Sequence, residues 1–260
     1  MSSLRDLRKC SLEKALCFQP LRGGILVAKK KTSPKRVFMN IILNSLMTKI
    51  KICGITRLQD ALDAAQAGAD ALGFNFSRQS PRLIAPEKAK EIIEKLPPFV
   101  QSAGIFVEQS PEEINAICLL CNLQIAQLHS EQYSPEQARS ITAAKVIRVF
   151  RPEENFAVQE VFEFAAKSNV KSFLFDAYRP DMAGGTGESI GASLAARIFN
   201  QIRTSCYAIL AGGLNAANVG EAILRVQPYG VDTASGVESE PGIKDSEKIE
   251  AFIRAVRKTS

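Results

Sequence analysis

From Lys49 onward the sequence repeats one pattern eight times: a short apolar run followed by a longer stretch with helical spacing. The apolar runs are Lys49–Ile55, Ala71–Phe76, Ser102–Val107, Ile125–His129, Lys145–Phe150, Ser172–Tyr178, Tyr207–Ala211 and Gly230–Ser235. The helical stretches are Leu58–Ala67, Pro86–Leu96, Pro111–Cys121, Ser134–Ala143, Glu153–Ser168, Ser189–Ile202, Ala216–Arg225 and Asp245–Arg257. Runs that are apolar throughout are typical of parallel strands buried on both faces. The repeat therefore predicts an α/β protein with eight parallel strands.

Eight strand–helix units can close into a barrel or spread into an open sheet. Eight units within roughly 210 residues, without a long insertion, favour the barrel, which needs roughly 200 to 250 residues. We expect a single (β/α)₈ barrel, a TIM barrel, over residues 47–260, preceded by an extension over residues 1–46. In such barrels the active site lies at the C-terminal ends of the strands, so candidate residues are sought there.

The extension differs from the rest of the chain in charge. Residues 1–46 hold ten Lys/Arg and two acids, a net charge of +8, so the rest of a chain with net charge +6 carries −2. Three interpretations stay open: a transit peptide, a basic arm, or translation that begins at Met47. We favour the last and expect residues 1–46 to be disordered or not native. The expected location is cytoplasmic, with organellar import if the extension is a transit peptide.

The composition argues against several other classes of protein. No apolar run approaches the ~18 residues of a membrane-spanning helix, and the mildly acidic body gives no reason to expect nucleic-acid binding. Six cysteines are too few for a disulfide scaffold at this length. Cys118 and Cys121 form a lone C-x-x-C in a chain with one histidine, so we expect them to pack in the interior and predict no metal site.

Two residues at strand ends suit proton transfer. Cys53 ends the first apolar run, and its thiolate could act as a base or nucleophile if its pKa were lowered from about 8.5. The alternative is a small buried apolar side chain. Asp176 follows three apolar residues of the sixth run. Burial there would raise the pKa of its carboxyl, as a general acid requires, although backbone donors could equally satisfy a structural carboxylate.

Two further residues suit substrate binding. Arg82 lies behind Pro81 after the second run, where a guanidinium can pair with a planar carboxylate. The alternative is a solvated surface arginine. His129 ends the fourth run and is a weaker candidate, because a hydrogen-bonded structural histidine is at least as common.

Small residues follow the last three strands. They are Gly184-Gly185-Thr186-Gly187, Gly212-Gly213 and Ser235-Gly236. Glycine-rich turns let backbone N–H groups approach a phosphate closely. Paired loops after strands seven and eight fit the recurrent phosphate site of these barrels. We therefore expect Gly185, Gly213, Ser235 and Gly236 to hold a phosphate, which together with the thiol and carboxyl indicates proton-transfer chemistry on a phosphorylated small molecule.

These motifs, in this order, resemble the phosphoribosylanthranilate isomerases over about residues 48–257. The segments that carry the resemblance are Lys51-Ile52-Cys53-Gly54-Ile55-Thr56, Ser80-Pro81-Arg82, Gln127-Leu128-His129, Phe175-Asp176, Gly184-Gly185-Thr186-Gly187, Leu210-Ala211-Gly212-Gly213-Leu214 and Ser235-Gly236-Val237-Glu238. The first of them is highly specific, whereas the glycine pairs occur in many phosphate-binding barrels.

The resemblance implies an Amadori rearrangement in tryptophan biosynthesis. N-(5-phosphoribosyl)anthranilate would become 1-(2-carboxyphenylamino)-1-deoxyribulose 5-phosphate, with no cofactor. It implies that Asp176 is the general acid, that Cys53 is the general base and that Arg82 binds the anthranilate carboxylate. It also implies a small-molecule substrate as the partner, with a monomer or homodimer as the assembly.

The sequence departs from the family pattern at two positions, and rival functions stay open. Ser130 stands where glycine is usual, and Ala234 stands where serine is common. The change at Ala234 could cost one hydrogen bond near the phosphate, worth about 1 kcal/mol. The rivals are another phosphate-binding barrel enzyme, a non-catalytic sensor or scaffold with the same fold, and a nucleic-acid-associated protein that uses the basic extension.

Overall fold

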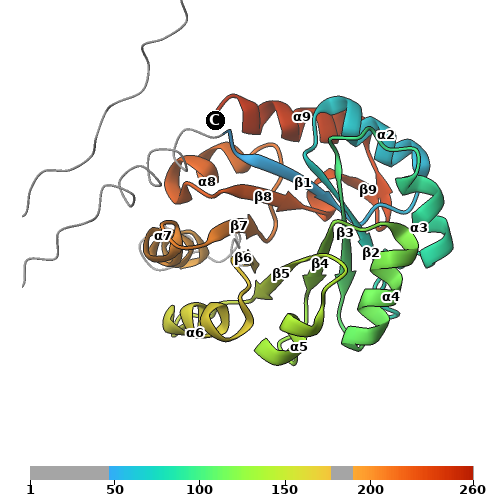
Figure 1. Ribbon diagram of the computed structural model, residues 1–260. Helices are drawn as coiled ribbons and strands as arrows, with labels where there is room; N and C mark the ends of the chain where they lie inside the picture. Colours follow the sequence, from blue (N-terminus) through green and yellow to red (C-terminus); the bar gives the residue numbers. More distant parts are fainter. Residues whose placement is uncertain (1–46, 177–189, 260) are drawn as a thin grey trace, which may run out of the picture. The chain divides into compact units, whose positions relative to one another are not determined.

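The chain forms the expected closed barrel, shown in Figure 1. We describe residues 47–176 and 190–259 of a computed structural model, all of which belong to one compact unit. The expected extension, residues 1–46, lies outside the described residues, so the division at Met47 stays a prediction. Within the described part of the chain, no helix is long and apolar enough to cross a membrane.

Eight parallel strands follow one another around the barrel in chain order, and the last pairs with the first. They are β1 Lys49–Cys53, β2 Ala71–Asn75, β3 Gln101–Phe106, β4 Ile125–Leu128, β5 Lys145–Phe150, β6 Ser172–Asp176, β7 Tyr207–Ala211 and β8 Gly230–Thr233. The helices are α2 Leu58–Ala67, α3 Pro86–Ile93, α4 Pro111–Cys121, α5 Pro135–Ser140, α6 Gln159–Ser168, α7 Ile190–Ile202, α8 Val219–Val226 and α9 Ser246–Arg257. They surround the strands in Figure 1, as expected of a TIM barrel.

The strands divide the core into two parts, because successive side chains alternate between the barrel interior and the layer under the helices. The interior holds a small apolar cluster on β5, β6 and β7, separate from the large cluster between strands and helices. Its buried members are Ile147, Val149, Leu174, Ile209 and Ala211. On the side of β1 and β8 the interior holds charged residues, since Lys51 is in register with Asp232. This polar part of the interior leads toward the site described below.

Several helix boundaries follow the sequence pattern. Ser110 and Ser134 cap α4 and α5, each in a capping box with the residue three positions later. Gly68 ends α2 in the left-handed conformation (φ 105°). Cys118 and Cys121 are both buried in α4, and the thiol of Cys121 donates to the carbonyl of Pro86 at 3.2 Å. The C-x-x-C is therefore a packing feature, as expected.

Several expected helices are shorter than the pattern predicts, and contacts in the structure explain two of them. The helix expected from Glu153 begins at Gln159, because the chain first turns so that the Phe156 ring packs against Phe150 and Phe175. The helix expected to reach Ala143 ends at Ser140. Beyond it, the side-chain oxygen of Asn115 accepts hydrogen bonds from the backbone N–H groups of Thr142 and Ala143, which removes them from the helix.

The segment after β8 contains elements that the sequence pattern did not predict. The expected strand to Ser235 ends at Thr233 and is followed by a 3₁₀ turn, η1 Ser235–Val237. An antiparallel hairpin of β9 Glu238–Glu240 and β10 Ile243–Lys244 then precedes α9. The hairpin is too short to show an apolar period, yet it carries side chains that reach the candidate site.

Candidate active site

A cavity of about 400 Å³ opens at the C-terminal ends of the strands. Its lining includes six of the eight residues that the sequence predicted: Cys53, Arg82, His129, Asp176, Gly213 and Ser235. The other two, Gly185 and Gly236, are missing from this lining for different reasons. Gly185 lies outside the described residues, and Gly236 is described but does not line the cavity. The structure thus brings residues from six strands or the loops after them to one cavity.

Cys53 lies at the end of β1, above Lys51 on the same face of the strand. Its register partner on β2 is Gly73. A Cβ atom on Gly73 would lie 2.8 Å from the Cys53 sulfur and 3.0 Å from the Lys51 ammonium. The missing side chain of Gly73 therefore leaves room for the thiol and the ammonium to share one space.

The thiol is surrounded by opposing charges. Burial is the largest influence and raises the pKa of Cys53 above its ordinary value. Lys51 lowers that pKa through its charge and a hydrogen bond, whereas Asp232 raises it. The lowered pKa that a dominant thiolate would need at neutral pH is therefore absent from the free protein. A thiolate formed here is a stronger base than usual, but fewer molecules carry it.

Asp176 ends β6, well separated from β1 around the barrel. Its side chain is 37% exposed, and a carboxylate oxygen lies 3.9 Å from Nε of Arg151. The expectation that Asp176 is buried is wrong, because β6 ends at this residue and the carboxyl reaches the open mouth of the barrel. The carboxyl and the thiol of Cys53 face one cavity from non-adjacent strands.

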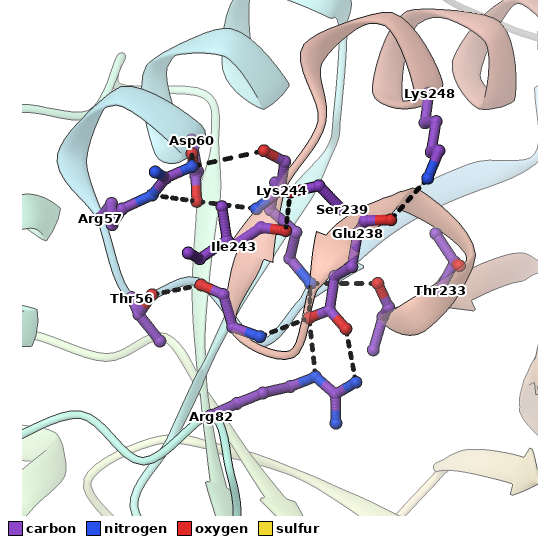
Figure 2. A network of polar contacts seen from close by, with 12 residues as sticks. Thr56, Arg57, Asp60, Arg82, Thr233, Glu238, Ser239, Ile243, Lys244 and Lys248 are labelled. Carbon is purple, nitrogen blue, oxygen red and sulfur yellow. Dashed lines mark hydrogen bonds and ion pairs between the residues drawn. The ribbon is translucent and has the colours of Figure 1, made fainter.

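Arg82 reaches the cavity from the loop after β2 and is held by the hairpin, as Figure 2 shows. Its Nε and Nη2 donate to the two carboxylate oxygens of Glu238 at 2.8 and 2.5 Å. The same carboxylate accepts from Nζ of Lys244 at 2.7 Å. Arg82 is therefore not the solvated surface arginine that the sequence left as the alternative.

His129 is held in its neutral form. Burial, with a smaller contribution from the charge of Arg151, lowers the pKa of His129 to about 4. Its Nδ1 lies 3.4 Å from the side-chain nitrogen of Gln127. Gln127 also lines the cavity, and its buried Oε1 has no hydrogen-bond partner among the described residues. At neutral pH both side chains present uncharged polar atoms to the cavity.

The loops after β7 and β8 lie against each other at the cavity. Gly212 and Gly213 both have positive φ (105° and 62°), which places a turn without side chains at the cavity. The Thr233 hydroxyl donates to the carbonyl of Leu214 at 2.7 Å. A Cβ on Gly236 would lie 2.0 Å from that same carbonyl oxygen. Glycine at 236 is thus required for the two loops to pack.

Sequence reasoning gave no role to four charged residues of this region: Lys51, Asp232, Glu238 and Lys244. A signal was available for Lys51. Lys51 precedes Cys53 by two positions, so both side chains lie on the same face of a strand. A charge buried on that face needs a partner. Glu238 belongs to a segment that carries the family resemblance, but its pairing with Lys244 left no signal, since the hairpin was not predicted. Among the described residues, no group of three or more His, Cys, Asp or Glu side chains could hold a metal ion.

Comparisons with known proteins agree with this geometry. The family model of N-(5'-phosphoribosyl)anthranilate isomerase matches residues 50–255. A protein of that name from Chlorobium phaeobacteroides is 80% identical over 210 residues, which cover 81% of this chain and 98% of the relative. The crystal structure of phosphoribosyl anthranilate isomerase from Thermotoga maritima is 37% identical with a TM-score of 0.70, and covers 82% of this chain and 100% of that one.

A further solved structure shows the same barrel with a ligand. It is a phosphoribosyl anthranilate isomerase in complex with reduced 1-(o-carboxyphenylamino)-1-deoxyribulose 5-phosphate. That protein is 35% identical with a TM-score of 0.69, and covers 82% of this chain and 100% of its own.

Proposed function

Because this chain belongs to the N-(5'-phosphoribosyl)anthranilate isomerase family, we propose that Cys53 and Asp176 carry out the proton transfers of that family's reaction. The reaction is the aldose–ketose rearrangement of N-(5-phosphoribosyl)anthranilate to 1-(2-carboxyphenylamino)-1-deoxyribulose 5-phosphate. The cavity supports this assignment of residues, because the thiol, the carboxyl, Arg82 and the small-residue loops all line it.

The first step opens the sugar ring. Asp176 donates a proton to the furanose ring oxygen, and the C1′–O bond breaks as the nitrogen lone pair forms a C=N bond. The product is an open-chain Schiff base with a hydroxyl at the former ring oxygen. The carboxylate left on Asp176 is stabilised by the guanidinium of Arg151.

The second step moves a hydrogen from C2′ to C1′. The thiolate of Cys53 removes the C2′ proton, and the electron pair of that C–H bond forms an enolamine while the C=N pair returns to nitrogen. Protonation at C1′, with loss of the proton from the C2′ hydroxyl, gives the ketone. Because protons enter and leave without net oxidation, this scheme needs no cofactor.

Binding groups flank the reacting centre. Arg82 pairs with the anthranilate carboxylate, and the loops at Gly213, Ser235 and Gly236 receive the phosphate, together with Gly185 in the loop outside the described residues. The neutral imidazole of His129 makes polar contacts with the middle of the substrate. Both negatively charged ends of the substrate are then held by protein groups, which fixes C2′ between the acid and the base.

The test is an isomerase assay on the full chain. The substrate is generated in situ and the loss of its anthranilate fluorescence is followed for the parent, Cys53→Ala and Asp176→Asn. Each group contributes about 10²- to 10⁴-fold to proton transfer, so both variants should lose activity on that scale. Cys121→Ala and Asp63→Asn, which lie outside the cavity, serve as controls. If either active-site variant keeps parental turnover, the role assigned to that residue is wrong.

The same assay separates the remaining possibilities. A folded parent that binds a phosphorylated ligand but never converts this substrate would support a sensor or a different sugar-phosphate enzyme. For the assembly and location we propose a cytoplasmic monomer or homodimer that acts on a small molecule without a nucleic-acid partner. Sedimentation velocity of the full chain distinguishes the two assemblies.

A further inference from the structure

The stem of Arg82 is fixed by the backbone of the loop after β1. A Cβ on Gly54 would lie 2.3 Å from Cδ of Arg82 and 3.2 Å from its Cγ. The arginine side chain therefore passes directly over Gly54, in space that any other residue would fill. This close approach fixes where the guanidinium begins, but it leaves the orientation of the guanidinium plane to other contacts.

Glu238 supplies that orientation. Its two oxygens accept from Nε and Nη2 of Arg82, so one edge of the planar guanidinium is fully used. A guanidinium has five N–H donors, and this pairing leaves both donors of Nη1 and one of Nη2. A second carboxylate can pair side by side with that remaining edge, which is the bidentate geometry that arginine favours.

Lys244 keeps the group of Arg82, Glu238 and Lys244, which we call the corner, positively charged. Its side chain is fully buried, and its Nζ lies 2.7 Å from Glu238 and 3.1 Å from the carbonyl of Ala234. Burial opposes ionisation of Glu238, but hydrogen bonds from Arg82 and Lys244 outweigh it and lower the pKa of Glu238. Burial lowers the pKa of Lys244, whereas its hydrogen bond to Glu238 and the charge of that carboxylate act in the opposite direction. With Lys244 protonated, the three side chains carry one net positive charge. Without Lys244, Glu238 would cancel the charge of Arg82.

The hairpin that carries Glu238 is anchored to the loop after β1, as Figure 2 shows. The Thr56 hydroxyl donates to the carbonyl of Gly242 at 2.5 Å, and the N–H of Gly242 donates to Glu238 at 3.2 Å. The backbone N–H of Lys244 donates to the carboxylate of Asp60 at 3.1 Å. Glu238 is thus held by backbone contacts that do not depend on Arg82.

We propose that Glu238 is a positioning residue for specificity: it turns the free edge of Arg82 toward the cavity, while Lys244 preserves the charge that attracts a substrate carboxylate. The proposal rests on the proposed function, in which Arg82 is the partner of the anthranilate carboxylate. It adds that recognition of this carboxylate depends on two residues that do not touch the substrate, both carried by a hairpin outside the β/α repeat.

The test compares two ligands that differ only in the carboxylate. One is reduced 1-(o-carboxyphenylamino)-1-deoxyribulose 5-phosphate, and the other carries a phenyl group in place of the carboxyphenyl group. Dissociation constants are measured by calorimetry for the full-length parent, Glu238→Gln, Lys244→Met, the double variant of both, and Arg82→Met. Glu240→Gln, on the exposed side of the same hairpin, is the matched control.

We expect Glu238→Gln and Lys244→Met each to weaken binding of the carboxylated ligand about tenfold or more, which corresponds to about 1.4 kcal/mol. Binding of the phenyl ligand should stay within twofold of the parent, which also shows that each variant is folded. The double variant keeps the net charge of the corner, so a loss that persists in it reports orientation alone. Glu240→Gln should match the parent with both ligands.

The outcomes distinguish a failure of the proposed role of Arg82 from a failure of the positioning role of Glu238. If Arg82→Met binds both ligands as the parent does, Arg82 is not the carboxylate partner and the proposed function fails at this residue. If Arg82→Met loses only the carboxylated ligand while Glu238→Gln loses neither, the positioning role of Glu238 is overturned. Equal weakening of both ligands by Glu238→Gln would also overturn it, because the effect would then be structural.

Discussion

Lys51 Nζ lies 2.8 Å from the carboxylate of Asp232 inside the barrel, with the Cys53 thiol as a third member of the group. Both charged side chains are almost inaccessible to solvent, at 6% and 10% exposed. An unpaired charge at such a depth would cost several kcal/mol, so each stabilises the other. Cys53 therefore ionises next to a charge pair that acts on it with both signs.

The first prediction is that the pKa of Cys53 moves in opposite directions when the two partners are removed. Lys51→Met removes the ammonium that favours the thiolate, so the pKa should rise. Asp232→Asn removes a repelling charge, so the pKa should fall. The measurement is the pH dependence of Cys53 alkylation by iodoacetamide, followed on its own peptide by mass spectrometry because the chain has six cysteines. Lys49→Met, on the same strand, is the control.

The pH profile of kcat/KM should follow the same order. The thiolate fraction falls tenfold for each unit by which the thiol pKa exceeds the working pH, so the activity of Lys51→Met at neutral pH should drop and recover as the pH rises. A Lys51→Met/Asp232→Asn variant avoids leaving one charge buried alone and should lie between the single variants. Parallel shifts of the same sign in both single variants would contradict this account.

The second prediction contrasts two glycines. Gly73→Ala places a Cβ 2.8 Å from the Cys53 sulfur and 3.0 Å from Lys51 Nζ. We expect a loss of about 1–3 kcal/mol in the free energy of unfolding together with a loss of activity. Gly220→Ala lies inside α8, where the new Cβ meets Thr259 at an ordinary 3.4 Å. It should gain up to about 1 kcal/mol from helix propensity and keep its activity. Urea unfolding and the isomerase assay test both variants.

The third prediction concerns the one histidine of the chain. Its imidazole should give a single titrating proton NMR signal with a midpoint near pH 4, because burial lowers the pKa of His129 to about 4. An unfolded histidine titrates near 6.5. As the pH falls from about 6.5 toward 4, the unfolded chain binds a proton that the folded chain does not, so stability should fall over that window. His129→Asn should remove this part of the pH dependence, and a midpoint near 6.5 in the folded parent would contradict the expected burial.

Local patterns made the barrel predictable. Eight buried parallel strands leave eight uninterrupted apolar runs, and Ser110 and Ser134 mark helix starts through contacts only three residues away. The same reasoning placed Cys53, Arg82, His129 and Asp176 at strand ends. These positions follow from the order of the elements, which the sequence displays directly.

The partners of these residues could not be predicted in the same way. Lys51 and Asp232 are 181 residues apart, and Arg82 and Glu238 are 156 apart. Such pairs form only when the barrel closes, so the pattern of apolar residues along the chain does not indicate them. The hairpin that holds Glu238 is too short to show alternation. The exposure of Asp176 depends on where β6 ends, which an apolar run alone does not define.

The last prediction tests the place of the phosphate. Gly236→Ala puts a Cβ 2.0 Å from the carbonyl oxygen of Leu214 and 2.8 Å from the Thr233 hydroxyl. Because backbone cannot move aside as a flexible side chain can, the loops after β7 and β8 must separate. We expect KM for the substrate and the inhibition constant of inorganic phosphate to rise together, by about tenfold or more if one or two backbone hydrogen bonds to phosphate are lost. Steady-state kinetics with phosphate as inhibitor measures both.

Gly220→Ala serves as the control for that experiment, since it adds the same methyl group within α8, where the nearest atom of Thr259 lies at 3.4 Å, and leaves the loops after β7 and β8 unchanged. Its phosphate affinity should change by less than that of Gly236→Ala. A Gly236→Ala protein that unfolds at a lower temperature but binds phosphate as the parent does would show that the glycine is needed only for packing. The phosphate would then have to bind elsewhere in the cavity, away from the loops after β7 and β8.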